Sequence, residues 1–402
     1  MSTICDFLVI GGGIIGLNVA IAIKTRHPDN SVILIDKEPH LGAHASGRNS
    51  GVLHAGFYYD ASSLKARFSR DGNKAMKDYC ESRGLSINRC GKLVVARDDN
   101  ELNVLMELYR RGQANQVEVQ LVDEKQAAEI EPRAKVYQQA IFSPTTASVN
   151  PREVVESLTR DAFALGITIL TDTRYAGHKG NTVTTSQGSI TAGYIINTAG
   201  LYADRIAMGF GFSKSHRILP FKGLYIYSDE PVGALRTNIY PVPDLRNPFL
   251  GVHFTLTVDG HIKIGPTATP AFWREHYQGL TNFNAEEMFE IVMRDLGLML
   301  SNDFGFRKLA VHELMKSFKP VMVSQAAQLA RGVEISNYQR WAPPGIRAQL
   351  FDIKKRRLET DFKYEGDNRS FHVLNAVSPA FTCSIPFAAH LVDEVERLAG
   401  RG

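Results

Sequence analysis

Three glycines near the start of the chain have the spacing that binds a phosphate group. Gly11, Gly13 and Gly16 form a G-x-G-x-x-G pattern directly after the apolar run 7–10. Gly11 permits a tight turn, Gly13 lets the backbone approach a pyrophosphate, and Gly16 allows a helix to pack closely on a strand. The helix N-terminus that follows offers N–H groups and the positive end of a dipole to phosphate oxygens.

An acidic residue completes this pattern. A second apolar run, 32–35, ends in Asp36, which lies 20 residues after Gly16. A carboxylate at this place can accept hydrogen bonds from ribose hydroxyls. Because strand, glycine loop, helix, second strand and acid occur in the right order, we predict a dinucleotide-binding unit. The alternative is a glycine-rich turn that only packs a helix on a sheet.

The bulk composition narrows the class of protein. A chain of 402 residues exceeds what one core usually serves, so we expect two domains. The net charge of +4 suits a small anionic substrate or cofactor and does not indicate nucleic acid. The four cysteines are scattered, without metal-ligand spacing, so we expect reduced thiols, no metal and a cytoplasmic protein.

Contact with a membrane is expected to be peripheral at most. The sequence contains no apolar run as long as a membrane span. The first apolar run belongs to the predicted nucleotide-binding strand, so we do not expect a signal peptide. The one dense basic run, 354–357, is interpreted as a hairpin turn between the apolar segment 349–351 and the alternating segment 360–364. Peripheral contact at the inner face of a membrane stays open.

Hydrophobic periodicity predicts the elements that must position these residues. The helical segments are 62–83, 100–113, 123–131, 151–163, 286–300, 309–329 and 386–398. The strands are 91–96, 166–170, 182–185, 193–197, 224–227, 238–242, 250–254 and 261–265, and the last four are expected to form an antiparallel sheet.

The order of these elements predicts an α/β fold in which the nucleotide-binding domain is discontinuous. We assign 1–88, 149–212 and 345–402 to a Rossmann-like domain, and 89–148 and 213–344 to an inserted α+β substrate domain built on an antiparallel sheet. A NAD-dependent dehydrogenase usually keeps its Rossmann half contiguous, whereas an inserted sheet is typical of FAD-dependent oxidases. The layout therefore favours a flavoprotein.

Seven short segments carry a family resemblance. They are 48–59, followed by 63–67; 239–244 with 249–254; 345–349; and 372–376 with 378–380. They resemble the L-2-hydroxyglutarate dehydrogenase/oxidase family of the D-amino-acid-oxidase-like (DAO) FAD oxidoreductases. The chain departs from that family at Leu224, Thr267, Phe381 and Cys383. These departures concern the substrate more than the fold or the cofactor.

The resemblance implies oxidation of a small 2-hydroxy acid, first of all L-2-hydroxyglutarate, to the 2-oxo acid. Hydride leaves C2 for flavin N5 while a base takes the hydroxyl proton, and histidine suits that base. His54 and His253 are the two candidates, and Arg347 is the catalytic cation that could clamp a carboxylate. Tyr58, Lys222 and Tyr240 are further candidates for substrate binding.

A larger set of residues is expected to bind FAD, on loops that follow strands or precede helices. The segment 378–380 precedes the last helix, whose N-terminus can stabilise negative charge on reduced flavin. The set is Gly11, Gly13, Ile15, Gly16, Asp36, Lys37, Gly42, Ser46, Arg48, Asn49, Ser50, Ala199, Gly200, Ser378, Pro379 and Ala380. Covalent attachment of FAD through His54 stays open.

Three other functions are weighed against this hypothesis. An FAD-dependent amine or amino-acid oxidase would differ only in the atom that C2 bears. A NAD-dependent dehydrogenase would lack the yellow colour of a flavoprotein. A non-catalytic flavin-binding protein would have no use for the two histidines. The electron acceptor, oxygen or a quinone, is left open.

Overall fold

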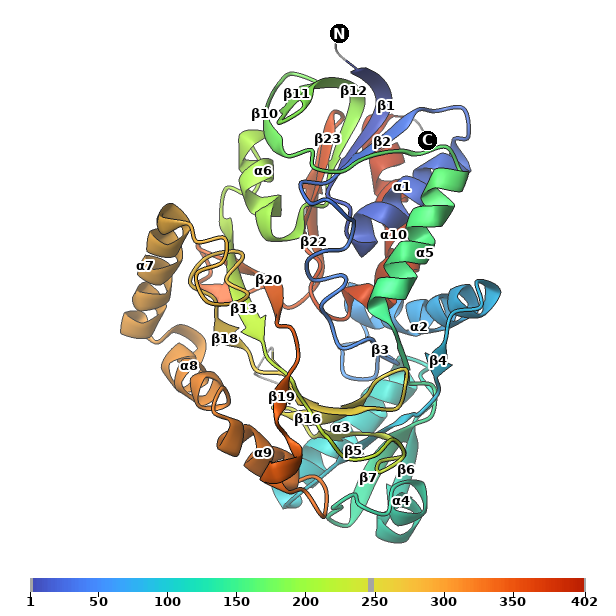
Figure 1. Cartoon of the computed structure of the whole chain (residues 1–402), viewed down its shortest axis with the longest axis vertical. Coiled ribbons are helices and arrows are strands. Elements are labelled where there is room, and N and C mark those ends of the chain that lie inside the picture. Colours follow the sequence, from blue (N-terminus) through green and yellow to red (C-terminus); the bar gives the residue numbers. More distant parts are fainter. Residues whose placement is uncertain (1–2, 245–248, 401–402) are drawn as a thin grey trace. The chain divides into compact units, whose positions relative to one another are not determined.

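The computed structural model describes residues 3–244 and 249–400, and the chain divides into two compact units (Figure 1). Unit 1 comprises Met1–Asn49, Pro151–Leu219 and Arg347–Gly402. Unit 2 comprises Ser50–Asn150 and Pro220–Ile346. Both units are therefore assembled from separated parts of the sequence.

Unit 1 is built on a sheet whose central strands are parallel. Strand β1 lies between β12 and β2 and pairs with both in parallel, and β23 pairs with β12. Helices α1, α5 and α10 lie beside one another next to this sheet (Figure 1). The strands are β1 (Thr3–Ile10), β2 (Val32–Ile35), β9 (Thr168–Leu170), β10 (Tyr175–Lys179), β11 (Thr182–Thr185), β12 (Gly188–Asn197), β22 (Lys363–Gly366) and β23 (Ser370–Asn375). The helices are α1 (Ile14–Arg26), α5 (Pro151–Ala164), α6 (Ala203–Gly209) and α10 (Ala380–Ala399).

The predicted dinucleotide-binding unit is present at the N-terminus. Strand β1 ends at Ile10, α1 begins at Ile14 with Gly13 as its N-cap, and β2 ends at Ile35. The last four residues of β1 and all of β2 are buried, as expected for strands that are covered on both faces. The predicted α/β fold class is confirmed.

Unit 2 is built on a sheet with the strand order β19-β14-β17-β16-β15-β5-β7-β6. The four strands predicted to form an antiparallel sheet, which are β14, β17, β16 and β15, do pair antiparallel. The pairing of β15 with β5 was not predicted and is parallel, with Lys92 opposite Asn238. The strands are β5 (Lys92–Val95), β6 (Gln120–Asp123), β7 (Gln139–Ser143), β14 (Ile226–Tyr227), β15 (Asn238–Pro241), β16 (His253–Leu256), β17 (Ile262–Gly265) and β19 (Arg340–Trp341). The helices are α2 (Leu64–Ser82), α3 (Asp99–Ala114), α4 (Glu124–Ile130), α7 (Ala285–Ser301), α8 (Phe306–Met315) and α9 (Lys319–Ala327).

The two faces of the unit 2 sheet differ in chemistry. Leu93, Ile239, Phe254 and Ile264 lie in one apolar core, together with residues of α9. Because side chains alternate along a strand, their neighbours point to the opposite face. The register places Lys92, Tyr240, His253, Thr255 and Lys263 on that face, which we call the polar face.

The division into units differs from the predicted domain bounds mainly in two segments: 213–219 lies in unit 1 instead of the substrate domain, and 50–88 also changes place. We assigned 50–88 to the nucleotide-binding domain, but the contacts of Ser50–Asn88 place it in unit 2. Strands β3 (Val52–Leu53) and β4 (Ile87–Asn88) both pair with β8 (Ala147–Val149). The side chain of Asn73 on α2 also donates hydrogen bonds to Leu53 O and Thr145 O. The sequence shows no sign of this because the pairing joins positions nearly 100 residues apart.

Two predicted helices have other bounds in the structure. The segment 309–329 forms not one helix but α8 and α9, with Pro320 in the first turn of α9. The last helix begins at Ala380 rather than at Pro386, which lies inside it. Proline in a helix interior removes one hydrogen bond and its ring crowds the carbonyl one turn earlier. Burial of Phe387, Leu391 and Val395 along one face nevertheless supports the continuous helix.

Two strands carry the chain between the units, and the second of them continues into a hairpin. Strand β13 (His216–Gly223) was not predicted; it passes from unit 1 into unit 2, and β20 (Gly345–Asp352) passes back. In unit 2, β13 pairs with β18 (Thr269–Pro270), and in unit 1, β20 pairs with β21 (Arg357–Leu358). The pairing of β20 with β21 confirms a hairpin at the basic run 354–357, although its second strand is 357–358 and not the predicted segment 360–364. Among the described residues no helix is long and apolar enough to cross a bilayer.

Candidate functional site

The glycine loop of unit 1 leaves no room for larger side chains. Gly11 has φ +106°, and a Cβ there would lie 2.7 Å from Thr198 O. A Cβ on Gly16 would lie 1.9 Å from Gly11 O. At Gly13 the closest atom to such a Cβ is Ser46 Oγ, at 3.0 Å. The loop is thus packed against the segment after β12, as the roles given to Gly11 and Gly16 require.

The predicted segment 42–49 folds against the glycine loop. Ser46 Oγ accepts a hydrogen bond of 2.8 Å from Ile14 N, at the start of α1, and Gly42 N donates one of 3.0 Å to Gly12 O. Arg48 and Asn49 donate to carbonyl oxygens of the same segment, Ala43 O and Ser46 O. The structure therefore brings Gly42, Ser46 and the α1 N-terminus together, including Ile15 in the first turn of that helix.

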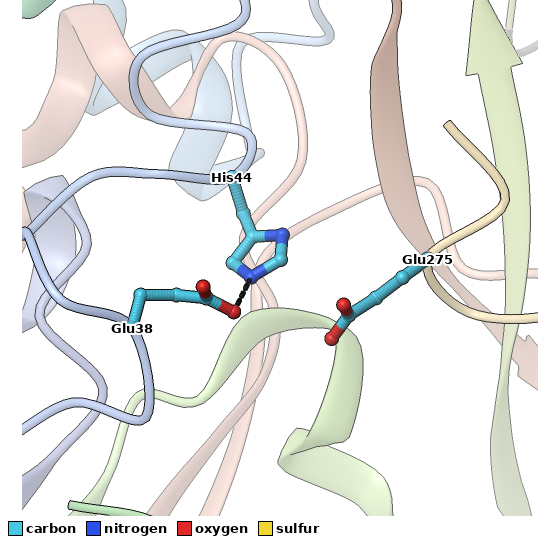
Figure 2. Close-up of side chains that lie close together, drawn as sticks. All are labelled: Glu38, His44 and Glu275. Atoms are coloured by element: carbon cyan, nitrogen blue, oxygen red, sulfur yellow. Dashed lines mark hydrogen bonds and ion pairs between the residues drawn. The ribbon is translucent and has the colours of Figure 1, made fainter. Parts of the chain in front are cut away.

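The acidic end of β2 holds the same loop. Asp36 Oδ2 accepts a hydrogen bond of 2.7 Å from Gly12 N, and Oδ1 accepts one of 2.9 Å from Glu38 N. Glu38 faces His44 Nε2 at 2.9 Å (Figure 2) and also contacts Lys37. The hydrogen bond from His44 and the contact with Lys37 lower the pKa of Glu38 to about 2. Lys37, predicted to bind FAD, is thus engaged with a carboxylate.

Two further predicted segments lie at strand ends of unit 1. Thr198 Oγ1 donates to Gly11 O at 2.9 Å. Ala199 and Gly200, which follow Thr198 in the sequence, therefore begin next to the glycine loop. Ser378, Pro379 and Ala380 form the start of α10, with Pro379 at the N-cap position. Arg347 lies on β20 in unit 1 and is partly buried.

The polar face of unit 2 contains a buried lysine that the sequence analysis missed. Lys92 has no exposed surface, and its Nζ lies 4.7, 4.5 and 4.9 Å from the ring centroids of Phe57, Tyr58 and Tyr240. No hydrogen-bond partner of Lys92 Nζ is present in the described part of the chain. Burial lowers the pKa of Lys92 from 10.5 to about 7. The three rings therefore enclose an amine that is easily deprotonated.

A second lysine on this face, Lys263, was also missed. It is 7% exposed, its Nζ donates to Ser50 O at 3.2 Å, and burial lowers its pKa to about 8. Lys92 precedes the apolar residues 93–95, and Lys263 lies between Ile262 and Ile264. A lysine in such a pattern is typical of an exposed face. The sequence holds no local signal that the second face of this sheet is covered as well. Ser50, predicted to bind FAD, lies in unit 2 beside Lys263.

The two candidate bases both lie in unit 2 and differ in surroundings. His253 is 3% exposed, stacks on Tyr240 with centroids 3.7 Å apart, and its Nδ1 lies 2.8 Å from Gly251 O. A carbonyl oxygen only accepts, so Nδ1 carries the hydrogen and Nε2 carries the lone pair in the neutral ring. His54 is buried, and burial followed by the charge of Lys92 lowers its pKa to about 3.

The predicted substrate-binding residues fall into two places. Tyr58 and Tyr240 meet at Lys92, and burial raises the pKa of both phenols well above 10. Lys222 lies on β13, where its carbonyl oxygen accepts hydrogen bonds from Thr267 and Thr269, and burial lowers the pKa of its amine. The structure thus joins Tyr58, Tyr240 and His253 through shared contacts and places Lys222 on another sheet.

We expect Lys92→Met to stabilise the protein and to flatten its dependence on pH. Folded Lys92 loses its proton near pH 7, whereas the unfolded side chain keeps it up to 10.5. The unfolded chain then binds more protons between these values, so the stability of the wild-type protein rises with pH across this window. Below pH 7 folding buries the protonated amine, and this lowers the free energy of unfolding by about 5 kcal/mol, at ~1.36 kcal/mol per pKa unit. Methionine removes it, and we expect a gain of about 2–4 kcal/mol at pH 7.

Urea unfolding from pH 7 to 10 with saturating FAD measures this prediction. Lys125→Met, at an exposed lysine of α4, is the matched control and should leave the pH slope unchanged. An unchanged slope in Lys92→Met would show that the folded protein does not release this proton.

The residues of unit 1 fit a flavin dinucleotide. The α1 N-terminus and the packed glycine loop can bind a pyrophosphate, and the Asp36 carboxylate has lone pairs beyond its two backbone contacts for a ribose. Ser46, next to Gly13, lies where a pyrophosphate oxygen would approach.

Comparisons with known proteins agree with this fit. A family model described as "FAD dependent oxidoreductase" (DAO) matches residues 6–393. The chain is 36% identical over 417 residues to the mitochondrial L-2-hydroxyglutarate dehydrogenase of Homo sapiens, covering 98% of this chain and 89% of that protein. It is 34% identical over 404 residues to L-2-hydroxyglutarate dehydrogenase of Escherichia coli (strain K12), covering 98% and 93%.

Solved structures share the fold. L-α-glycerophosphate oxidase from Mycoplasma pneumoniae, with FAD bound, superposes with a TM-score of 0.76 at 21% identity, covering 99% of this chain and 95% of that one. Glycine oxidase from Geobacillus kaustophilus gives 0.72 at 20% identity, covering 98% and 95%. The cofactor is therefore FAD, and the chain belongs to the DAO family of FAD-dependent oxidoreductases, among the L-2-hydroxyglutarate dehydrogenases.

Proposed function

We propose that this enzyme oxidises L-2-hydroxyglutarate to 2-oxoglutarate, with FAD bound by unit 1 and substrate bound by unit 2. The single observation that carries the proposal is the identity of 34–36% to L-2-hydroxyglutarate dehydrogenases over nearly the whole chain. The polar face supports it, because it combines a histidine of defined tautomer with two buried amines.

The reaction removes two electrons and two hydrogens from the substrate. Bound FAD supplies the acceptor for the hydride that leaves C2. The chain itself must take the proton of the 2-hydroxyl group, and we assign this step to Nε2 of His253. The hydrogen bond from Nδ1 to Gly251 O and the stacking on Tyr240 hold the ring in the required orientation.

The two carboxylates of the substrate need cationic partners. Lys263 carries a proton at neutral pH for most of the time and lies on the same face as His253, so we assign one carboxylate to it. Arg347 is the candidate for the other, since guanidinium binds carboxylate in a bidentate manner. The further candidate contacts of the substrate are Tyr58, Tyr240 and Lys222. We assign to His54 and Lys92 the role of tuning the charge of the site.

Anaerobic bleaching of the flavin absorbance tests the substrate. L-2-hydroxyglutarate should reduce the flavin within seconds, while D-2-hydroxyglutarate, L-lactate, glycine and L-proline should not. Response to an amino acid alone would show an amine-oxidising enzyme on the same fold. Response to L-lactate with equal efficiency would show a site that does not recognise the second carboxylate.

We further propose that helices α7 and α8 of unit 2 form a membrane-binding surface. The two helices contact each other, and their outer sides are strongly apolar. Leu300 is 71% and Phe289 is 68% exposed; the other exposed apolar residues are Val292, Met293, Leu296, Val311, Leu314 and Met315, with Phe318 just after α8. Arg307 and Lys308 begin α8 and are exposed. An apolar face flanked by cations suits anionic lipid, and a quinone in the membrane would be the electron acceptor.

We expect the enzyme to cosediment with vesicles that contain phosphatidylglycerol and less with pure phosphatidylcholine. The double variant Phe289→Ser, Leu300→Ser removes two apolar side chains, each worth about 1.5–3 kcal/mol on burial, so vesicle affinity should fall about 100-fold or more. Val232→Ser, at an apolar residue exposed elsewhere in unit 2, is the matched control. Equal sedimentation of both variants would contradict the assignment of this surface.

A further inference from the structure

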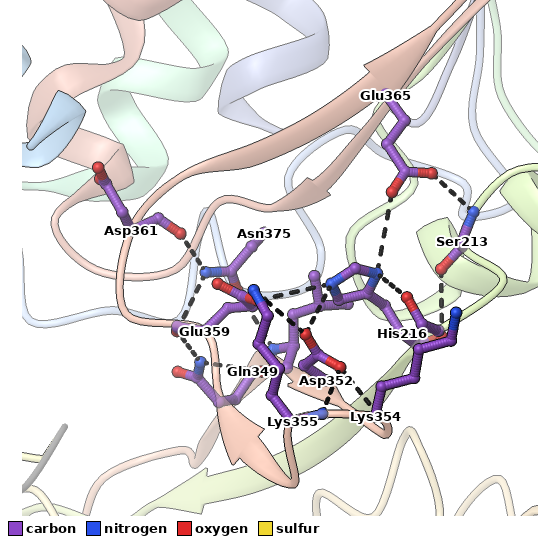
Figure 3. A network of polar contacts seen from close by, with 12 residues as sticks. Ser213, His216, Gln349, Asp352, Lys354, Lys355, Glu359, Asp361, Glu365 and Asn375 are labelled. Carbon is purple, nitrogen blue, oxygen red and sulfur yellow. Dashed lines mark hydrogen bonds and ion pairs between the residues drawn. The ribbon is translucent and has the colours of Figure 1, made fainter.

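A histidine of unit 1 is surrounded by three carboxylates, apart from the residues assigned to FAD and substrate. His216 begins β13, Asp352 ends β20, and Glu359 and Glu365 lie on the segment that follows β21 and in β22 (Figure 3). The side chains of His216 and Asp352 are 8% and 5% exposed. Four segments that are distant in sequence thus converge on one imidazole.

The distances within this cluster are too long for direct hydrogen bonds. His216 Nε2 lies 3.5 Å from Glu359 Oε1 and 3.9 Å from Asp352 Oδ2, and Nδ1 lies 3.8 Å from Glu365 Oε1. A charge-assisted hydrogen bond between such groups would be about 2.7–2.9 Å long. A nearly buried ring therefore points Nε2 between two carboxylates without closing on either of them (Figure 3).

The same distances are close to those between ligands of one metal ion. For Zn²⁺ with N and O ligands at about 2.0–2.2 Å in tetrahedral geometry, neighbouring ligand atoms lie roughly 3.4 Å apart. One atom each of His216, Asp352 and Glu359 lies within 4.8 Å of the other two. We propose that His216, Asp352 and Glu359 bind a divalent metal ion such as Zn²⁺, with water in the fourth position.

The groups around these three ligands support the assignment. Asp352 Oδ1 accepts hydrogen bonds from the backbone N–H groups of Lys354 and Lys355, at 2.9 and 3.0 Å, which leaves Oδ2 for the site. Glu365 holds Ser213 N at 2.8 Å with one oxygen and faces His216 Nδ1 with the other. A carboxylate behind the distal nitrogen is the usual orienting partner of a metal-bound histidine.

Charge balance points in the same direction. Two carboxylate ligands neutralise one divalent cation, whereas without it the carboxylates of Asp352 and Glu359 lie close together beside a nearly buried ring. Among the described residues, Asp352 forms ion pairs with His216 and with Lys355, whose Nζ lies at 3.9 Å and whose side chain is 61% exposed. Solvent weakens that attraction, so Lys355 compensates the charge poorly. The metal would tie the β20–β21 hairpin to β13 and thereby order unit 1.

Calorimetric titration of the chelator-treated holoenzyme with ZnCl₂ tests the site. One Zn²⁺ per chain should bind, and the melting temperature should rise with Zn²⁺ concentration. Glu359→Gln removes one ligand from a partly exposed position, and Zn²⁺ affinity should fall at least 10-fold. Glu118→Gln, at an exposed carboxylate of unit 2, is the matched control and should bind Zn²⁺ as the wild type does.

Two results would overturn the proposal: absence of stoichiometric Zn²⁺ binding, or equal affinity in Glu359→Gln and the wild type. Zinc-edge X-ray absorption of the wild-type complex provides a readout that does not depend on the folding of a variant. It should show only nitrogen and oxygen ligands at about 2.0–2.2 Å. Sulfur at about 2.3 Å would instead place the metal at a cysteine and would also overturn the proposal.

Discussion

His253→Asn should slow flavin reduction by L-2-hydroxyglutarate about 10²–10⁴-fold, the usual effect of losing a general base. The amide nitrogen of asparagine replaces Nδ1 and can keep the hydrogen bond to Gly251 O, which is 2.8 Å long in the wild type. Nε2 is lost without a substitute. The variant should therefore bind substrate normally and fail in the proton transfer. Stopped-flow absorbance under anaerobic conditions measures the reduction rate directly.

The matched comparison is His54→Asn. Its pKa of about 3 makes His54 a weak base, so this variant should lose less activity than His253→Asn. His261→Asn, at an exposed histidine of unit 2, should be unaffected. The pH profile gives a second readout, because the limb that reports deprotonation of the base should vanish in His253→Asn. A larger loss in His54→Asn, with His253→Asn within threefold of the wild type, would make His54 the base.

Gly16→Ala should yield a protein that purifies without FAD. The new Cβ would lie 1.9 Å from Gly11 O in the glycine loop and 2.6 Å from Thr198 Oγ1 in the segment after β12 that packs on this loop. Helix α1 would have to move, carrying its N-terminal N–H groups away from the pyrophosphate site. Overpacking of this kind costs about 1–3 kcal/mol or more in stability, and we expect FAD affinity to fall at least 100-fold.

The ratio of flavin to protein absorbance and a fluorescence titration with FAD measure this effect. Gly297→Ala is the matched control, since it also replaces a helical glycine, in α7, and a Cβ there meets no atom within 4 Å. It should keep its FAD and gain about 0.5–1 kcal/mol in stability. Stoichiometric FAD with wild-type affinity in Gly16→Ala would contradict the packing argument.

The parts of the fold that local sequence determines were predicted well. The glycine loop, α1 and Asp36 follow from spacing and capping within 36 residues, and α2 begins after Ser63, as one of the two expected caps. Strand β13 and the parallel pairing of β5 with β15 were missed, because both depend on partners far along the chain. Propensity and alternation contain no information on such pairing.

The candidate site shows the same limit. His253 and Tyr240 were identified, but the buried lysines 92 and 263 were not, since a lysine in a strand of alternating pattern indicates an exposed face. Their role depends on the aromatic side chains that cover them, Phe57 and Tyr58 from one loop and Tyr225 from another. The carboxylates around His216 lie between residues 352 and 365, far from the histidine in the sequence, and share no motif with it.

The order in which unit 1 is assembled has a consequence for synthesis on the ribosome. Strand β12 pairs with β1, which is made before it, and with β23, which is made well after it, and α10 packs on α1. The nucleotide-binding half cannot close until residues 370–399 have left the exit tunnel, whereas all of unit 2 has been translated by residue 346. Strand β1 can pair with β2 and β12 once residue 197 has been made, but the other edge of β12 and the side of α1 that packs on α10 stay uncovered until β23 and α10 follow. These two surfaces are therefore the ones that chaperones have most reason to protect.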